Sequence, residues 1–197
     1  MDNAAERVED FFTILDTQKF RDKDVENILD HDYVFWMGDL NFRLDDMSRT
    51  EVERNIRNNN FEALLKNDQL IKCQEEGIIF DDFTEGKITF PPTYNAKNRV
   101  PAWCDRILHL VHEDSFENIT LSAKQIHYTS HPVYQNSDHK PVTALYEIQS
   151  DFKHLKNYVS YIWAADDAEK FGQKGVTLTF KAKSVTVEPG TYRLCYI

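Results

Sequence analysis

The stretch that decides the fold is residues 34–44, VFWMGDLNFRL. With the preceding tyrosine it forms an unbroken apolar run from Tyr33 to Met37, which ends at Gly38. An apolar run without alternating polar residues is typical of a central strand that is buried on both faces. We therefore expect other elements of the chain to cover this strand on both sides.

Helix and strand patterns lie on either side of this central strand. In residues 5–20, apolar side chains recur at helical spacing (Val8, Phe11, Phe12, Leu15), which predicts an amphipathic helix that covers a core. Thr50 and Glu53 can form a capping box, so we expect a helix over 50–58 and a second one over 61–76. Strands are then predicted at 87–90, 106–112 and 141–149.

Beyond residue 150 the pattern changes to short strand candidates separated by turn residues. They are YVSYIW, GVTLTFKAKSVTV and TYRLCYI. We therefore expect two units: a mixed α/β domain over residues 1–150 and a small β unit over residues 151–197.

The composition excludes several classes of protein. The chain has 197 residues, 41% of them hydrophobic and 13% aromatic, which is typical of a packed globular protein and not of a disordered one. Its six glycines form neither a G-x-G-x-x-G nor a G-x-x-x-x-G-K pattern, so nucleotide sites of the Rossmann and Walker types are excluded.

The cysteines and the N-terminal residues bear on location. The three cysteines, Cys73, Cys104 and Cys195, form no C-x-x-C pair, so they favour neither a zinc ribbon nor a disulfide framework. The first residues, MDNAAERVEDFF, lack the order of a signal peptide, and the longest apolar runs have five residues. We expect a chain that is neither secreted nor membrane-spanning and that works in a reducing, cytoplasmic compartment.

The charge is unevenly distributed along the chain. The net charge of −10 disfavours a nonspecific binder of nucleic acid. Residues 1–86 carry a net charge of −12, whereas residues 87–106 carry +3. The one basic island in an acidic chain indicates a site for an anionic ligand.

Three strings place polar residues directly beside predicted strands, where side chains can converge on a cleft. Asp39 and Asn41 follow the central strand: the carboxylate could hold or deprotonate a water, and the amide could bind a phosphoryl oxygen. The second string, FPPTYNAKNRVPAWCDRIL (90–108), contains the basic island, and the third, SDHKPV (137–142), places Asp138 beside His139. A histidine of near-neutral pKa can donate to phosphoryl charge, and a neighbouring carboxylate can bind a divalent metal.

Each string also has a structural interpretation. Asp39 and Asn41 could be turn formers, and the Ser-Asp-His sequence could be a loop cap. Trp103 could be a core side chain, with Asp105 and Arg106 a solvated ion pair.

Taken together and in this order, WMGDLNFR, PPTY, RVPAWCDRIL and SDHKPV resemble the inositol polyphosphate 5-phosphatases, over about residues 5–149. The resemblance implies a Mg²⁺-dependent phosphatase of the endonuclease/exonuclease/phosphatase superfamily. Such an enzyme removes the 5-phosphate of phosphoinositides or soluble inositol phosphates in peripheral contact with membranes. The implied fold class is α/β: half of a two-sheet α/β/β/α sandwich, followed by a small β appendage. That appendage resembles pieces of the β-sandwich found in the skeletal-muscle and kidney-enriched inositol phosphatase and its relatives.

The resemblance also implies a role for individual residues. Asp39 would orient or deprotonate the attacking water, Asn41 and His139 would contact the scissile phosphate, and Asp105 would orient and charge-stabilise His139. Asp138 would support the Mg²⁺ shell. The residues near the other ring phosphates would be Tyr94, Lys97 and Arg99.

The chain departs from the family pattern in two respects. Position 95 is Asn where the family usually has Lys, and the loop that follows is shorter. The upstream half of the family domain supplies an early Asn, the metal-binding Glu and a His, and nothing in residues 1–30 matches it. We therefore expect the 197 residues alone to bind Mg²⁺ weakly and to release phosphate at or near background. A non-catalytic binding module and, less favoured because of Lys97 and Arg99, a nuclease of the same superfamily are the alternatives.

Overall fold

A computed structural model describes residues 4–21, 25–112, 120–149 and 159–164. The helices are α1 (Ala4–Thr17), the 3₁₀ helix η1 (Ile28–Asp30), α2 (Arg49–Arg57), α3 (Phe61–Leu65) and α4 (Gln69–Glu75). The strands are β1 (Tyr33–Asp39), β2 (Thr84–Glu85), β3 (Asp105–Val111), β4 (Ser122–Ser130), β5 (Val142–Gln149) and β6 (Val159–Ala164).

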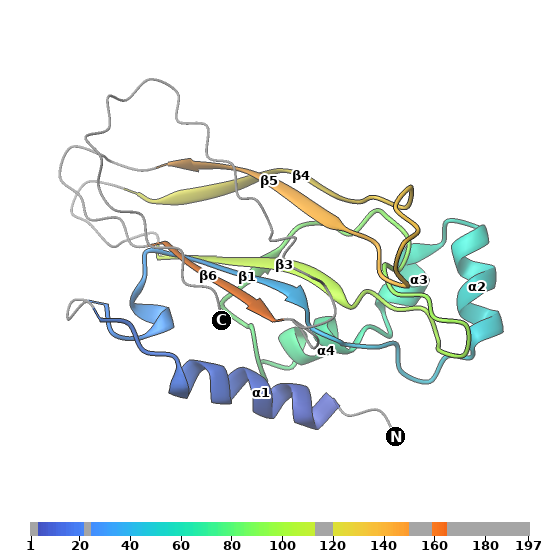
Figure 1. The fold of residues 1–197 in the computed structure, drawn as a ribbon, viewed down its shortest axis with the longest axis horizontal. Helices are drawn as coiled ribbons and strands as arrows, with labels where there is room; N and C mark the ends of the chain where they lie inside the picture. The colour runs from blue at the N-terminus through green and yellow to red at the C-terminus, as the bar shows by residue number, and fades with distance from the viewer. Residues whose placement is uncertain (1–3, 22–24, 113–119, 150–158, 165–197) are drawn as a thin grey trace.

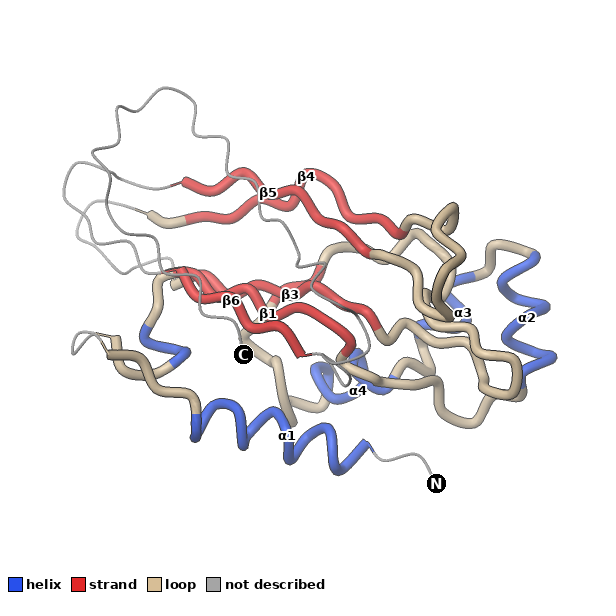
Figure 2. The backbone as a smooth tube through the Cα atoms, viewed as in Figure 1, coloured by secondary structure: helices blue, strands red, loops and turns tan. Residues whose placement is uncertain are grey.

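The described strands form two stacked sheets with helices on the outer face of the larger one. The larger sheet has the order β2-β3-β1-β6, and β4 and β5 form a two-stranded antiparallel sheet. Figures 1 and 2 show β4 and β5 as a layer over β1 and β3, while α1 and α4 lie on the opposite side of the larger sheet. The α/β sandwich class predicted from the sequence is confirmed.

Strand β1 is buried on both faces, as its apolar run predicts. Val34 and Trp36 belong to the core under α1, which also contains Phe11. Tyr33 and Phe35 belong to a second core, against Tyr146 and other residues of the β4–β5 layer. Because side chains alternate along a strand, every residue of the apolar run contributes to one of the two cores.

The helices follow the predicted pattern except at their boundaries. The N-cap of helix α2 lies two residues earlier than we predicted: Ser48 and not Thr50 caps the helix, and its hydroxyl accepts the N–H of Glu51 at 3.3 Å. The predicted helix 61–76 is two helices, α3 and α4. Asp68 separates them, because its carboxylate accepts the N–H of Ile71 at 3.1 Å and caps α4.

Two strand predictions were wrong or incomplete. Residues 87–90 are not a strand: Ile88 and Phe90 are buried in the cluster around Trp103, and the indole N–H of Trp103 donates to the carbonyl of Phe90 at 3.0 Å. Their alternation therefore reflects burial of side chains and not pairing in a sheet. Strand β4 was missed, because its alternation is broken by a register shift between Gln125 and His127.

Strand β6 contains most of the predicted YVSYIW strand. It pairs in parallel with β1, with Tyr33 opposite Val159, so it forms part of the larger sheet. The remaining strand candidates beyond residue 164 lie outside the described residues, and the division of the chain at residue 150 stays a prediction. Within the described residues, no helix has the length and apolar character that a transmembrane span requires.

Candidate active site

The ends of two neighbouring strands bring the two predicted carboxylates together. Asp39 is the last residue of β1 and Asp105 the first of β3, and the antiparallel register places them directly opposite each other. Gly38, the residue before Asp39 in β1, has a φ of 138°, a conformation that side-chain-bearing residues rarely adopt. Asn41 also lies in the left-handed region, with φ of 56°, and its N–H donates to Asp39 Oδ1 at 2.9 Å.

His139 reaches the carboxylates from the loop before β5. A short backbone ladder fixes this loop beside residues 93–95: the N–H of Lys140 donates to the carbonyl of Thr93 at 2.8 Å, and the N–H of Asn95 donates to that of Asp138 at 2.9 Å. Tyr94 and His139 form an isolated antiparallel bridge between these two hydrogen bonds. The histidine backbone is therefore held by the PPTY string, far away in the sequence.

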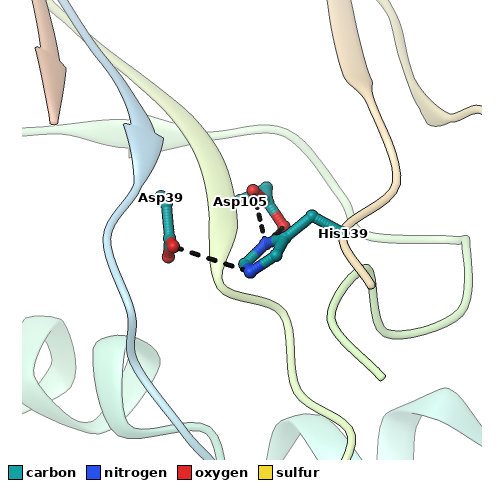
Figure 3. A group of neighbouring side chains, drawn as sticks. All are labelled: Asp39, Asp105 and His139. Atoms are coloured by element: carbon teal, nitrogen blue, oxygen red, sulfur yellow. Dashed lines mark hydrogen bonds and ion pairs between the residues drawn. The ribbon is translucent and has the colours of Figure 1, made fainter. Parts of the chain in front are cut away.

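The three side chains form a compact half-buried cluster (Figure 3). His139 Nδ1 lies 3.0 and 3.1 Å from the two carboxylate oxygens of Asp105, which can only accept, so Nδ1 carries the proton. His139 Nε2 lies 3.8 Å from Asp39 Oδ2, within ion-pair range. Thr93 Oγ1 donates to Asp105 Oδ2 at 2.6 Å and fixes the carboxylate behind the imidazole. The imidazole of His139 thus lies between the two carboxylates, with Nδ1 toward Asp105 and Nε2 toward Asp39.

The electrostatics of the cluster favour positive charge near the two carboxylates. The pKa of Asp39 is raised above its ordinary value, first because burial disfavours the carboxylate and then because Asp105 repels it. Burial alone would lower the pKa of His139, but the hydrogen bond to Asp105 and the charges of the neighbouring aspartates outweigh burial, so this pKa is raised. A cation or a protonated imidazole relieves the same repulsion between carboxylates.

The structure brings four of the predicted site residues together: Asp39, Asn41, Asp105 and His139. Tyr94 joins them, because its ring centroid lies 4.8 Å from that of His139. Three others stand apart from this contact set. Lys97 and Arg99 are exposed on the loop that follows Tyr94, and Asp138 is exposed beside His139, where its charge contributes to the raised pKa of His139.

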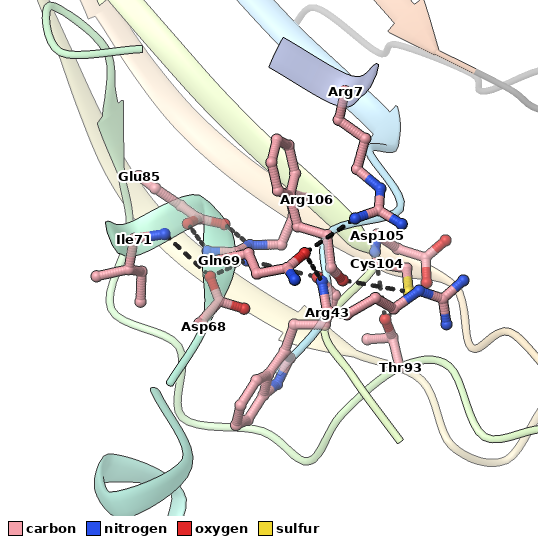
Figure 4. Close-up of polar contacts among 12 residues, drawn as sticks. Arg7, Arg43, Asp68, Gln69, Ile71, Glu85, Thr93, Cys104, Asp105 and Arg106 are labelled. Atoms are coloured by element: carbon pink, nitrogen blue, oxygen red, sulfur yellow. Dashed lines mark hydrogen bonds and ion pairs between the residues drawn. The ribbon is translucent and has the colours of Figure 1, made fainter. Parts of the chain in front are cut away.

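Our sequence analysis missed three side chains that organise this region: Arg43, Thr93 and Arg49. Arg43 stacks on the ring of Tyr94, with its Cζ atom 4.3 Å from the centroid, and its guanidinium donates to the amide oxygen of Asn41. Arg43 is held from behind by Gln69, which accepts its backbone N–H at 3.0 Å (Figure 4). The sequence signal that could have identified Arg43 is its position two residues after Asn41.

The donor set fits a divalent cation. Asp39, Asp105 and His139 each offer a ligand atom, and these atoms all lie within 4.8 Å of one another. Carboxylate oxygens are the ligands that Mg²⁺ and Ca²⁺ prefer, and the pKa of Asp39 is raised, first by burial and then by the charge of Asp105. Asp138 is not part of this group of ligand atoms, so its part in a metal shell stays a prediction.

Two family models match the chain. Residues 1–145 match Endonuclease/Exonuclease/phosphatase family 2, and residues 112–197 match the SKICH domain. The two matches overlap, and the second contains the whole region in which we predicted a partial β-sandwich.

Relatives and a solved structure agree with the first match. Mouse inositol polyphosphate 5-phosphatase K is 26% identical over 262 residues, covering 100% of this chain and 56% of the relative. Rat phosphatidylinositol 4,5-bisphosphate 5-phosphatase A is 39% identical over 171 residues, covering 78% of the chain and 17% of the relative. The inositol polyphosphate 5-phosphatase domain of SPsynaptojanin, solved with inositol (1,4)-bisphosphate and calcium ion, has a TM-score of 0.63 at 37% identity over 73% of this chain and 42% of its own. The chain thus spans about half or less of each of these proteins.

Proposed function

This chain belongs to Endonuclease/Exonuclease/phosphatase family 2 and is a relative of the inositol polyphosphate 5-phosphatases, and from that premise we propose that it forms part of a phosphatase for the 5-phosphate of phosphoinositides or inositol polyphosphates. The observation that carries the proposal is the cluster of Asp39, Asp105 and His139 at the adjoining ends of β1 and β3. The name of the rat relative supports a lipid substrate, and the inositol bisphosphate in the solved structure supports the soluble head group.

The proposed reaction is hydrolysis of a phosphomonoester. The oxygen of a water attacks phosphorus, the bond between phosphorus and the ring oxygen breaks, and the ring oxygen takes up a proton. Asp39 is placed to accept the proton of the water, because its raised pKa makes it a stronger base than an ordinary aspartate. The protonated His139 donates through Nε2 to a phosphoryl oxygen, and Asp105 holds the imidazole from its other nitrogen.

Asn41 and Arg43 complete the phosphate side of the proposed site. Arg43 donates to the amide oxygen of Asn41 and thereby fixes the orientation of this amide beside the cluster. Stacking on Tyr94 fixes the direction of the Arg43 guanidinium. The residues that would hold a divalent cation are Asp39 and Asp105, with Asp138 beside them; we propose Mg²⁺. When bound, the cation neutralises charge on the phosphoryl group in the transition state.

The same proposal covers the setting of the reaction. The basic loop with Lys97 and Arg99, in a chain of net charge −10, supports an anionic head group over a long polyanion such as nucleic acid. We propose cytoplasmic phosphoinositide signalling as the setting, in peripheral contact with a membrane.

The test is Mg²⁺-dependent release of inorganic phosphate from phosphatidylinositol 4,5-bisphosphate and from a soluble inositol polyphosphate. Because the chain spans about half of the mouse relative, the assay is run on the chain itself and on a chimaera that places the preceding part of that relative before Met1. We expect near-background release from the chain and Mg²⁺-dependent release from the chimaera. A soluble, folded chimaera whose release does not exceed that of its His139→Ala variant would overturn the proposal in favour of a binding module.

A further inference from the structure

The basic loop runs from Tyr94 to Ala102 and is closed at its base by backbone hydrogen bonds between these two residues. The N–H of Tyr94 donates to the carbonyl of Ala102 at 3.0 Å, and the N–H of Ala102 donates back at 3.2 Å. Inside the loop, the N–H of Arg99 donates to the carbonyl of Ala96 at 3.2 Å. Lys97 and Arg99 are both exposed on this loop, so their reach depends on its backbone conformation.

One side chain from another element binds the loop backbone at several points. Arg49, the first residue of α2, donates through Nη1 to the carbonyls of Ala96, Lys97 and Arg99 at 2.7, 3.0 and 2.7 Å. Its Nη2 donates to the amide oxygen of Asn95 at 3.1 Å. Figure 1 shows α2 at the end of the molecule toward which β1 points, where the loops that lead into β3 and β5 lie. A planar guanidinium with fixed donor directions can hold several acceptors at once, which an ammonium cannot do in the same geometry.

The charge of Arg49 is already balanced. Its Nε donates to Glu53, one helical turn away, at 2.6 Å. With its donors engaged by four acceptors of the loop and by Glu53, Arg49 has little capacity left for an anion. Its role is therefore to shape the loop, and Lys97 and Arg99 remain to meet a ligand.

The loop is also joined to the reaction site. The N–H of Asn95 donates to the carbonyl of Asp138, next to His139, while the Asn95 side chain accepts from Arg49. A lysine at position 95, as the family pattern has, could not accept this hydrogen bond. The asparagine therefore connects α2, the basic loop and the histidine segment.

We propose that Arg49 is a positioning residue: it fixes the 95–99 loop and thereby sets the affinity for a ligand that carries a second phosphate besides the one at His139. The identity of the ligand rests on the proposed function. The claim that Arg49 fixes the loop does not rest on the proposed function. The role of Arg49 and the identity of the ligand can therefore fail separately.

The experiment compares three variants of the 197-residue chain. Arg49→Met removes the donors and keeps an alkyl side chain, whereas Arg49→Lys keeps the charge with fewer directed donors. Arg54→Met is the matched control: it makes the same charge change on the same helix at an exposed side chain. Binding of inositol 1,4-bisphosphate and of inorganic phosphate is measured by calorimetry, and amide hydrogen exchange is followed at residues 95–99.

We expect Arg49→Met to weaken binding of the bisphosphate about tenfold, the effect of losing one charge-assisted network of hydrogen bonds. Binding of inorganic phosphate should change less than about twofold, because it has no second phosphate to place. Exchange at the Arg99 amide should accelerate in both Arg49 variants and not in Arg54→Met.

Three results would overturn the inference. Unchanged exchange at residues 95–99 in a folded Arg49→Met would show that the loop does not need the side chain. Full affinity in Arg49→Lys, or equal losses in Arg49→Met and Arg54→Met, would show that only charge matters. If the wild-type chain binds no inositol bisphosphate, the proposed ligand is wrong, and so is the inferred effect of Arg49 on ligand affinity. The exchange data then still decide whether Arg49 fixes the loop.

Discussion

Two neighbouring residues of β3, Asp105 and Arg106, belong to charge clusters of opposite character. Asp105 faces His139 and Asp39 in a cluster whose side chains are between 20% and 24% exposed. Arg106 is fully buried on the other side, where it binds Asp68 Oδ1 at 2.9 Å and Glu85 Oε2 at 2.6 Å (Figure 4). The alternation of side chains along β3 therefore separates a partly exposed, reactive cluster around Asp105, the open cluster, from the buried cluster around Arg106.

The two clusters differ in burial and in the cation that their carboxylates face. In the buried cluster, Glu85 also accepts the hydroxyl of Tyr128 at 2.7 Å, and Tyr128 in turn accepts the N–H of Ile107 at 3.2 Å. This network connects α4, β2, β3 and β4. In the open cluster, two carboxylates share one imidazole. A buried cluster whose charges are paired indicates a structural role, although Asp68 Oδ2 has no hydrogen-bond partner among the described residues, whereas carboxylates gathered at an accessible site indicate a functional one.

The largest expected effect is the loss of turnover in His139→Ala. Removing a group that donates to the phosphoryl oxygen costs on the order of 10² to 10⁴ in kcat. The free energy of unfolding should change by less than about 1 kcal/mol, because the side chain is partly exposed. Phosphate release by the active form and urea denaturation measure the two effects. Asp39→Asn should behave in the same way, and wild-type turnover in either variant would remove the residue from the site.

The second prediction concerns stability and uses Arg106→Met. The substitution leaves Asp68 and Glu85 without their buried cation, and breaking a buried ion pair in this way costs about 3–5 kcal/mol of unfolding free energy. The exposed ion pair between Lys87 and Glu62 is the control, since Lys87→Met should change stability by no more than about 0.5 kcal/mol. Equal effects in the two variants would mean that the cluster at Arg106 does not differ from a surface pair.

Much of this organisation follows from sequence, but the pairing of distant side chains does not. The apolar run at Tyr33 to Met37 requires cover on both faces, and the order of the motifs identifies Asp39, Asp105 and His139, because local patterns and a family resemblance carry that information. The interpretation of Asp105 and Arg106 as a solvated pair was wrong, because each binds partners from other elements. Arg49 was missed for the same reason: its acceptors are backbone carbonyls almost fifty residues away, which no local pattern reports.

The third prediction tests the electrostatics of the open cluster. Asp105→Asn should lower the pKa of His139, because it removes a charged hydrogen-bond acceptor. Since the raised pKa of His139 stabilises the protonated form in the folded state, its contribution is fully present below the ordinary histidine pKa of about 6.5 and is lost as pH rises through the folded pKa. The variant should therefore lose less stability than wild type as pH rises above 6.5. Titration by NMR measures the pKa directly, and Asp138→Asn, the weakest of the contributing charges, should lower it less.

The smallest expected effect is that of Arg99→Ala, which separates the basic loop from the reactive cluster. Arg99 is exposed, so water and salt screen its contact with a non-scissile phosphate, and we expect KM for a bisphosphorylated substrate to rise about two- to fivefold at low salt. The kcat should stay unchanged, because the contact is equally strong in the ground state and the transition state. Lys19→Ala is the control, an exposed base just after α1. If kcat falls with KM unchanged, Arg99 acts on the transferring phosphoryl group and the loop belongs to the reactive cluster. An increase in KM that persists at about 1 M salt would mean instead that the substitution deforms the loop, as the loss of Arg49 should.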